Sequence, residues 1–169
     1  MYGYDEKNLL AYAAVGDTVS QYEIGTDGLR VGKTVGNEST AYTIDQDGNV
    51  ILENQDDIIR GHQALAKRTE DGSYYYYIYN GHGDVVMLVD ESGNVKNSYA
   101  YDAWGKITSE TETIPNSIKY AGEYYDAETG FLYYCDIIGQ RLEKPSKIKG
   151  LTDLCPIFLC LFLKANMLF

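Results

Sequence analysis

The chain has 169 residues, enough for one domain of ordinary size with a buried core. Its 17 tyrosines and 17 glycines favour strands and tight turns, because tyrosine suits a half-buried sheet and glycine allows the positive φ of a hairpin. A formal net charge of -11 argues against a phosphate-binding surface, so we expect neither nucleic acid nor an anionic membrane as a partner.

The N-terminal segment MYGYDEKNLLAYAAVGD lacks the basic start and the long apolar run of a secretory signal peptide. Three interpretations stay open: a fragment of a larger protein, a cytosolic protein, or export without a signal peptide.

Turn signals recur at intervals of roughly 8 to 20 residues through the first 134 residues, the spacing of hairpins in an all-β protein. Gly105 and Gly130 mark two turns, and five glycine-containing pairs are interpreted as two-residue hairpin turns. These pairs are Asp27-Gly28, Asp47-Gly48, Asp71-Gly72, Gly83-Asp84 and Ser92-Gly93. The strands expected between the turns are Leu29 to Val35, Ser39 to Ile44, Val50 to Glu53, Tyr74 to Asn80, Val85 to Asp90, Val95 to Tyr101 and Lys119 to Tyr124.

The segment from Gln55 to Arg68 is ambiguous. Its apolar residues fit one short helix, but Gly61 interrupts the pattern, and a strand or a loop fits equally well. In the tyrosine run that follows, alternation along a strand places Tyr74 and Tyr76 on one face and Tyr75 and Tyr77 on the other.

An internal repeat consists of tyrosine, a spacer, aspartate and then glycine. We expect the tyrosines to pair across strands, the aspartate to accept backbone hydrogen bonds at the turn, and the glycine to close the turn. Several such hairpins in succession predict antiparallel repeats that form a curved open sheet. The residues assigned to this structural motif are Tyr42, Asp45, Gly48, Tyr99, Tyr101, Asp102, Trp104, Gly105, Tyr120, Gly122, Tyr124, Tyr125, Asp126 and Gly130.

Four stretches in order identify a family: TDGLRVGKTV, YYYYIYNGHGDVVMLVDESGNV, YAYDAWGKI and KYAGEYYDAETG. Together they resemble the YD-repeat or Rhs family, in particular its Rhs-associated core region. The resemblance implies a β-sheet strip that spirals into a hollow shell, as in bacterial polymorphic toxins, insecticidal toxin complexes and teneurins. It also implies a C-terminal toxin domain and the remainder of the shell as partners, in a protein that is secreted or lies at the cell surface.

After Tyr134 the chain departs from the family. The usual continuation is replaced by CDIIGQRLEKPSKIKG, so the aspartates linked to self-cleavage in many members have no counterpart and no autoproteolytic site is assigned. A neighbouring reading frame is compatible with an ending close to the family's, which predicts a truncation or a frameshift near Tyr134. The expected division is therefore residues 1–134 as the β-sheet region and residues 135–169 as a divergent, irregular or short helical tail.

The tail's apolar run, residues 156–163, is too short to span a membrane, so no transmembrane segment is expected. Its cysteines match no zinc pattern, and His62 and His82 lie in no nucleophile motif. The sequence therefore predicts no catalytic, metal or cofactor site, and a protein that is not an enzyme.

Trp104 fits either a packing anchor or an exposed ring that stacks on sugars. Two functions remain: a structural segment of an Rhs-type shell, or an adhesive or carbohydrate-binding surface protein with glycans as partners. In either case an open sheet leaves unpaired edge strands, so we expect residues 1–134 to self-associate.

Overall fold

A computed structural model of the protein describes residues 1–134 and 141–143. The described chain is all-β, apart from one short 3-10 helix, η1, at Tyr120–Gly122. The strands are β1 (Tyr2–Tyr4), β2 (Leu10–Val15), β3 (Thr18–Ile24), β4 (Arg30–Val35), β5 (Glu38–Ile44), β6 (Val50–Glu53), β7 (Asp56–Arg60), β8 (Ala64–Arg68), β9 (Tyr74–Tyr79), β10 (Val85–Asp90), β11 (Val95–Tyr101), β12 (Ile107–Glu112), β13 (Tyr124–Asp126), β14 (Phe131–Tyr134) and β15 (Arg141–Glu143).

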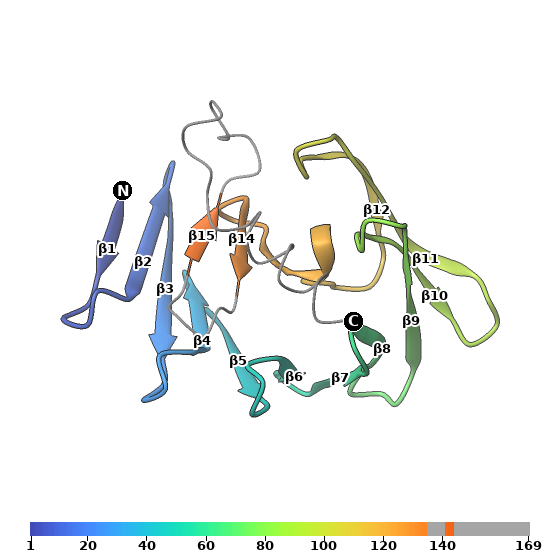
Figure 1. Ribbon diagram of the computed structural model, residues 1–169, viewed down its shortest axis with the longest axis horizontal. Helices are drawn as coiled ribbons and strands as arrows, with labels where there is room; N and C mark the ends of the chain where they lie inside the picture. The colour runs from blue at the N-terminus through green and yellow to red at the C-terminus, as the bar shows by residue number, and fades with distance from the viewer. Residues whose placement is uncertain (135–140, 144–169) are drawn as a thin grey trace, which may run out of the picture.

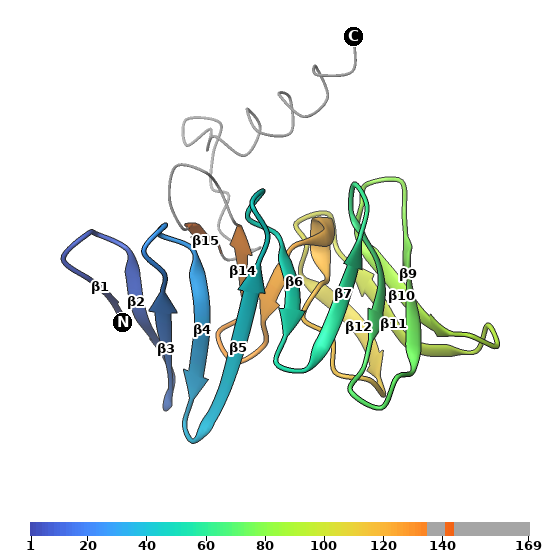
Figure 2. The same cartoon turned by 90° about the horizontal axis from the view of Figure 1, so that it is seen from below.

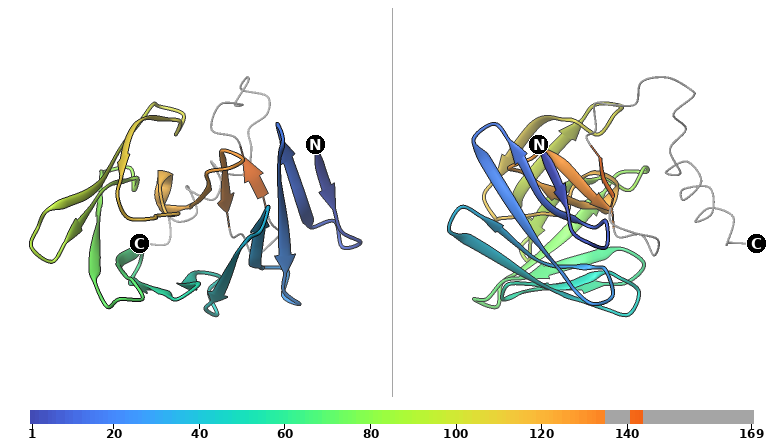
Figure 3. Two further views of the ribbon diagram at one scale, coloured as in Figure 1. Left: turned by 180° about the vertical axis from the view of Figure 1, so that it is seen from behind. Right: turned by 90° about the vertical axis from the view of Figure 1, so that its left-hand side faces the viewer.

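Strands β1 to β12 form one antiparallel sheet in which every strand lies beside its neighbours in sequence. The sheet bends into an arch (Figure 1), and the view from below shows its strands side by side (Figure 2). Residues 113–134, which we call the strap, leave β12 and run back inside the arch, as the view from behind also shows (Figure 3). The predicted antiparallel hairpin fold and curved open sheet are confirmed.

One of the two types of hairpin turn in the sheet spans five residues. In residues 45–49 the Asp45 N–H donates to the Asn49 carbonyl at 2.9 Å, and the Gly48 N–H donates to the Asp45 carbonyl at 3.2 Å. The Asp45 carboxylate accepts two more backbone N–H groups, and Gly48 has a φ of +84°. The same backbone bonds close residues 5–9, 25–29, 69–73, 80–84, 90–94 and 102–106.

The prediction of two-residue turns at the five glycine-containing pairs is therefore wrong. The glycine is the fourth residue of a longer turn, and in most of these turns the strand register shifts by one residue beside it, as between Thr43 and Ile44. A turn with a left-handed glycine and a bulge accommodates the twist of the strands as well as a two-residue turn does.

Two-residue turns occur at three other pairs, for which no turn was predicted. They join Val15 to Thr18, Val35 to Glu38 and Glu53 to Asp56. Their first residues, Gly16, Gly36 and Asn54, have φ values of +60°, +60° and +54°. The two turn types alternate, which gives the first strands a period of 20 residues.

Six of the seven expected strands agree with the structure to within one residue at each end. The ambiguous segment from Gln55 to Arg68 contains two strands, β7 and β8. The expected strand from Lys119 to Tyr124 is wrong, because Ala121 and Gly122 have positive φ and reverse the chain before β13.

The core lies between the concave face of the sheet and the strap. Its main cluster contains Tyr42, Tyr77 and Tyr99 from the sheet with Ile118 and Tyr124 from the strap. On β9, Tyr77 is 6% exposed and Tyr76 is 42% exposed, which agrees with the predicted alternation of faces.

Strand β14 pairs with β13 on one side and with β15 on the other. Because β15 lies beyond Tyr134, part of the segment assigned to the tail belongs to this small sheet. The apolar run at residues 156–163 and the three cysteines lie outside the described residues. No helix in the described part of the chain is long and apolar enough to cross a membrane.

Candidate functional site: the strap on the concave face

The strap is hydrogen-bonded to the sheet at points along most of its length. Near its start, Lys67 of β8 donates to the Pro115 carbonyl at 2.9 Å. Further along, the Ser117 hydroxyl donates to Glu53 at 2.7 Å. At its far end, the Arg30 N–H donates to the Tyr133 hydroxyl at 3.1 Å. Strands far apart in the arch therefore contact one short segment.

Among the described residues, the most buried ion pair joins Arg30 of β4 to Asp126 of β13. Arg30 Nη1 lies 2.7 Å from Asp126 Oδ2, and the two residues are 2% and 1% exposed. Lys33 Nζ lies 3.0 Å from Asp126 Oδ1 and also pairs with Glu128. Both carboxylate oxygens of Asp126 thus have a cationic partner that is more than 90 residues away in the sequence.

Three tyrosine rings surround the guanidinium of Arg30. Its Cζ lies 4.0 Å from the ring centroid of Tyr133, 5.2 Å from that of Tyr22 and 5.4 Å from that of Tyr42. Guanidinium groups stack favourably on such rings when water is excluded. The arrangement stabilises a charge that would otherwise be costly to bury.

Charge pairing controls the ionisation of this centre. Burial alone would raise the pKa of Asp126, but Arg30 and Lys33 outweigh it and hold the pKa below its ordinary value. Burial is also the largest influence on Arg30, lowering its pKa, but Asp126 outweighs it and the net pKa is raised. Both groups are charged across the physiological range, so the centre acts as a fixed ion pair.

Arg30 departs from its own repeat. At the 20-residue period its position corresponds to Leu10 and Val50, which are apolar and buried at 6% exposure each. Asp126 departs as well, because the corresponding Asp45 caps its own turn, whereas the Asp126 side chain contacts residues of β3 and β4. Arg30 and Asp126, the two residues that differ from the repeat pattern, contact each other, so this ion pair fixes where the strap lies on the sheet.

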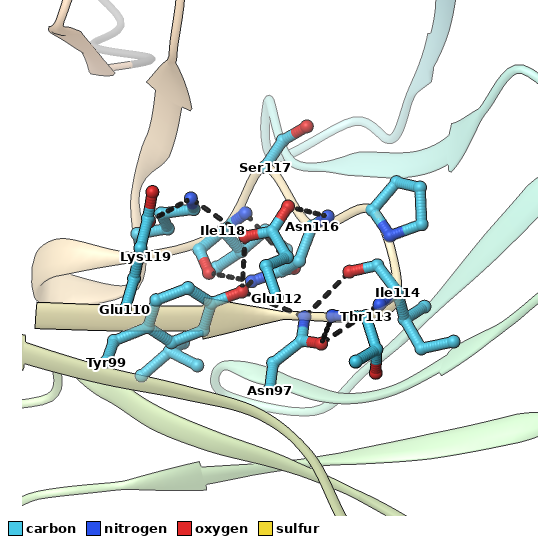
Figure 4. A network of polar contacts seen from close by, with 12 residues as sticks. Asn97, Tyr99, Glu110, Glu112, Thr113, Ile114, Asn116, Ser117, Ile118 and Lys119 are labelled. Atoms are coloured by element: carbon cyan, nitrogen blue, oxygen red, sulfur yellow. Dashed lines mark hydrogen bonds and ion pairs between the residues drawn. The ribbon is translucent and has the colours of Figure 1, made fainter.

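A second network holds the beginning of the strap (Figure 4). Asn97, which is fully buried, accepts the N–H groups of Thr113 and Ile114 at 2.9 and 3.0 Å. Its amide nitrogen donates to the Ile114 carbonyl and to the Tyr99 hydroxyl. The Tyr99 hydroxyl in turn donates to Glu112 at 2.7 Å. One asparagine therefore satisfies three backbone groups where the chain leaves β12.

Lys119 lies at the other end of this network. Its ammonium is 2.9 Å from Glu112 and 3.2 Å from Glu110, and it lies 4.9 Å from the ring centroid of Tyr99. Burial and then the bond to Glu112 raise the pKa of Tyr99, which keeps its hydroxyl a donor.

A third contact holds η1 against the turn at residues 80–84. Asp84, which is 5% exposed, accepts the Ala121 N–H at 2.9 Å, and His82 Nδ1 lies 2.8 Å from the same oxygen. Asn80 donates to the other oxygen at 2.7 Å. Burial would raise the pKa of Asp84, but the bonds from His82 and Asn80 lower it overall.

The structure separates the repeat-motif residues into two groups. Turn residues such as Asp45 and Asp102 have the predicted capping bonds. The tyrosines pack mostly through the strap rather than in ladders along the sheet, as in the contact of Tyr42 with Tyr124 at 5.9 Å. Arg30, Lys33 and Asn97 were not predicted as site residues.

Two further motif glycines and their neighbours have defined roles. Gly130, with a φ of +70°, ends the turn between β13 and β14. Gly105 lies against the ring of Tyr120, and Tyr120 packs 5.7 Å from Tyr101. Trp104 is 57% exposed.

The described residues contain no group of three or more histidine, cysteine, aspartate or glutamate side chains arranged for a metal. A shallow depression of about 590 Å³ beside Asp56, Glu70, Asp71 and Pro115 is open to solvent and acidic. The strap is held on the sheet by an ion pair and by hydrogen bonds.

No family model matches the sequence. The chain is 38% identical over 142 residues to the tRNA3(Ser)-specific nuclease WapA of Bacillus spizizenii. It is 37% identical over the same length to the tRNA nuclease WapA of Bacillus subtilis strain 168. Each match includes 76% of this chain but only 6% of the relative.

The fold is similar to part of the crystal structures of TcdB2-TccC3. For the TcdB2-TccC3-TEV structure the TM-score is 0.64 at 16% identity, over 86% of this chain and 8% of that one. For TcdB2-TccC3 itself the TM-score is 0.60 at 17% identity. These likenesses support an Rhs-like fold for the β-sheet region.

The names of the relatives correct one prediction. The sequence predicted a protein that is not an enzyme, and this is wrong, because the relatives are named as tRNA nucleases. That prediction rested on the residues of this chain, which spans only 6% of the length of the relatives named for the activity.

Proposed function

We propose that this chain is a segment of the β-sheet shell of an Rhs-type polymorphic toxin, in which the shell would encapsulate or present a C-terminal effector. The observation that carries the proposal is the single meander of 12 strands bent around its own strap. The likeness to TcdB2-TccC3 and the 38% identity to a WapA nuclease support it.

For the full-length protein we propose the activity named for the relatives, cleavage of tRNA, with a secreted or cell-surface location. Within this chain, residues 1–134 would form the shell segment and residues 135–169 a divergent tail produced by a frameshift, of which Arg141–Glu143 pairs with β14. That residues 1–134 do not bind nucleic acid stays a prediction, which rests on the acidic composition.

The coding locus gives the first test. A long repeat-coding frame upstream, and a family-like ending in a neighbouring frame near codon 134, are the expected results. A gene that encodes these 169 residues alone, with no family-like ending in another frame, would contradict both the shell and the frameshift.

The second test uses the protein that the locus encodes. Electron microscopy should show hollow particles, and tRNA cleavage should rise when the shell is opened by mild denaturant. Asp126→Asn should lower the denaturant concentration at which cleavage appears, because it removes the buried partner of Arg30. Asp45→Asn, the same change at the corresponding repeat position, should leave that concentration unchanged. Equal nuclease activity before and after opening would argue against encapsulation.

A second candidate, an adhesive or carbohydrate-binding surface, is favoured by one observation, the exposure of Trp104. It is compatible with the first, because a toxin shell also has an outer surface.

A further inference from the structure

Arg60 is an exception at one repeated position of the sheet. It is the last residue of β7, and it pairs with Ala64 of the next strand beside a one-residue shift of the register. The other odd-numbered strands from β1 to β11 end on an aromatic or aliphatic residue with the same kind of pairing. These residues are Tyr4, Ile24, Ile44, Tyr79 and Tyr101. A cation therefore stands where the repeat places an apolar side chain.

This position faces the core of the arch. Ile44, Tyr79 and Tyr101 pack against the main core cluster. The Tyr79 hydroxyl donates to the carbonyl of Ala64, the strand partner of Arg60, at 2.7 Å. Arg60 itself is half-buried, and its Nη1 atom is buried. The guanidinium thus reaches the concave side of the sheet, while part of the side chain stays open to solvent.

Arg60 lacks the acidic partner that other arginines have. Arg30 pairs with Asp126, and Arg68 pairs with Asp57. Within residues 1–134 and 141–143, Arg60 forms no ion pair and its Nη1 makes no hydrogen bond. A buried cationic group without a counter-charge is costly, so its presence on an apolar position needs a reason other than packing.

Tyr124 of the strap supplies a second unpaired group. It is 7% exposed, and its hydroxyl is buried without a hydrogen-bond partner in the described part of the chain. Burial raises the pKa of this hydroxyl most, Glu53 raises it further, and the positive charge of Arg60 lowers it. Burial likewise raises the pKa of Tyr79, and Arg60 lowers it. The Tyr124 hydroxyl is therefore a neutral donor that lies close enough to Arg60 to respond to its charge.

The chemistry of the two groups selects a class of ligand. A water molecule would accept both donors, but it would leave the charge of Arg60 unbalanced. A carboxylate brings two acceptor oxygens and one negative charge, and its shape matches a guanidinium. A phosphate group carries more negative charge, which Glu53 and the net charge of -11 oppose.

The same face of the sheet already binds a carboxylate carried by a peptide segment, because Arg30 holds Asp126 of the strap. We propose that Arg60 and Tyr124 form a receptor site for an aspartate or glutamate carboxylate on a partner segment that lies on the concave face. The site would fix that segment as Arg30 fixes the strap. The proposal concerns carboxylate binding by this chain, so it goes beyond the shell role and does not depend on it.

The experiment compares a peptide carboxylate with its uncharged counterpart. Thermal unfolding of the 169-residue chain is followed in N-acetylaspartate α-amide and in N-acetylasparagine α-amide, with sodium chloride holding the ionic strength constant. The aspartate compound should raise Tm in a saturable manner, because a ligand that binds only the folded state stabilises it. The asparagine compound has nearly the same shape and should leave Tm unchanged. Calorimetry then gives the Kd of the aspartate compound.

Three variants locate the binding site. Arg60→Leu restores the apolar pattern of the repeat and should weaken binding by about tenfold or more, because it removes the charged donor. Tyr124→Phe keeps the ring and should weaken binding by at least about threefold. Arg68→Leu removes an exposed arginine that already has a carboxylate partner, so it should leave Kd unchanged. Circular dichroism checks that each variant is folded, and Tyr124→Phe decides if Arg60→Leu does not fold.

Several results would overturn the proposal. They are no rise in Tm with the aspartate compound, an equal rise with the asparagine compound, and an unchanged Kd in Arg60→Leu or, should that variant not fold, in Tyr124→Phe. Binding of sodium acetate without binding of the aspartate compound would also overturn it, in favour of a free small carboxylate. Tighter binding of inorganic phosphate than of the aspartate compound would overturn it in favour of a phosphate ligand.

Discussion

Replacing Asp126 by asparagine tests whether the strap is held by its buried ion pair. The change keeps the shape of the side chain but removes the charge that faces Arg30, which is 2% exposed. Breaking a buried pair from one side leaves an uncompensated charge and costs about 3–5 kcal/mol. For a domain of this size that corresponds to a fall in Tm of about 6–20 °C. Urea denaturation of the 169-residue chain gives the free energy of unfolding.

The repeat supplies a matched control. Asp45→Asn is the same substitution at the corresponding place of an exposed turn, and Asn80 already fills that place in another turn with the same backbone bonds. We expect it to change the free energy of unfolding by less than about 1 kcal/mol.

Restoring the apolar pattern of the repeat separates the pair from its parts. Arg30→Leu combined with Asp126→Leu should return stability to within about 1 kcal/mol of the original chain or above it, because an apolar pair of similar size often replaces a buried ion pair without loss. A loss below about 1 kcal/mol for Asp126→Asn alone would refute the reasoning.

The same variant has a pH signature. The pKa of Asp126 lies below its ordinary 3.8, so its contribution to stability is complete above that value and is lost as the pH falls through the lowered pKa. The difference in unfolding free energy between the original chain and Asp126→Asn should therefore shrink below pH 4. A difference that stays constant down to pH 2 would show that the charge of Asp126 is not its cause.

Three other changes probe the turns and the beginning of the strap. Gly105→Ala should lower Tm more than Gly93→Ala does. Both sites have a φ near +80°, which costs an alanine about 1–2 kcal/mol, but only at Gly105 would the added methyl group overlap a tyrosine ring. Asn80→Asp should lower Tm by placing two carboxylates together, and adding Asp84→Asn should restore it, because the new amide can donate to the carboxylate at position 80 while its oxygen still accepts the Ala121 N–H. Asn97→Ala should lower the free energy of unfolding, measured in urea, by about 2–4 kcal/mol, since it leaves backbone groups of the strap buried without partners. For each of these three changes, an unfolding midpoint equal to that of the original chain would contradict the contact on which the prediction rests.

Local pattern predicted the sheet well because hairpin pairing is local. Strands β6, β10 and β11 have the expected bounds, since β-branched, aliphatic or aromatic residues between turn signals define them. The turns were misassigned because an Asp-Gly pair reads the same in a two-residue turn and at the end of a five-residue turn. Only the position of the preceding aspartate or its substitute distinguishes the two.

The site was harder to predict, because its partners are distant in sequence. A comparison at the 20-residue period would have found Arg30, since a cation stands where Leu10 and Val50 are apolar. That comparison gives no partner, because nothing local connects position 30 to Asp126. The sequence therefore marks Arg30 as unusual but does not identify Asp126 as its partner.

The polar anchors of the strap have a physical reason. An arch built of similar 20-residue units offers several nearly equivalent apolar places for a tyrosine-rich segment, so apolar packing alone would not select one. A buried cation at one repeat and a buried carboxylate on the strap penalise every other placement by leaving both charges unpaired. Lys67, Lys119 and Asn97 add the same penalty at other points along the strap. On this argument the ion pair contributes less to total stability than to the uniqueness of the closed state, which is why the Leu-Leu replacement is expected to stay stable while its strap loses a fixed position.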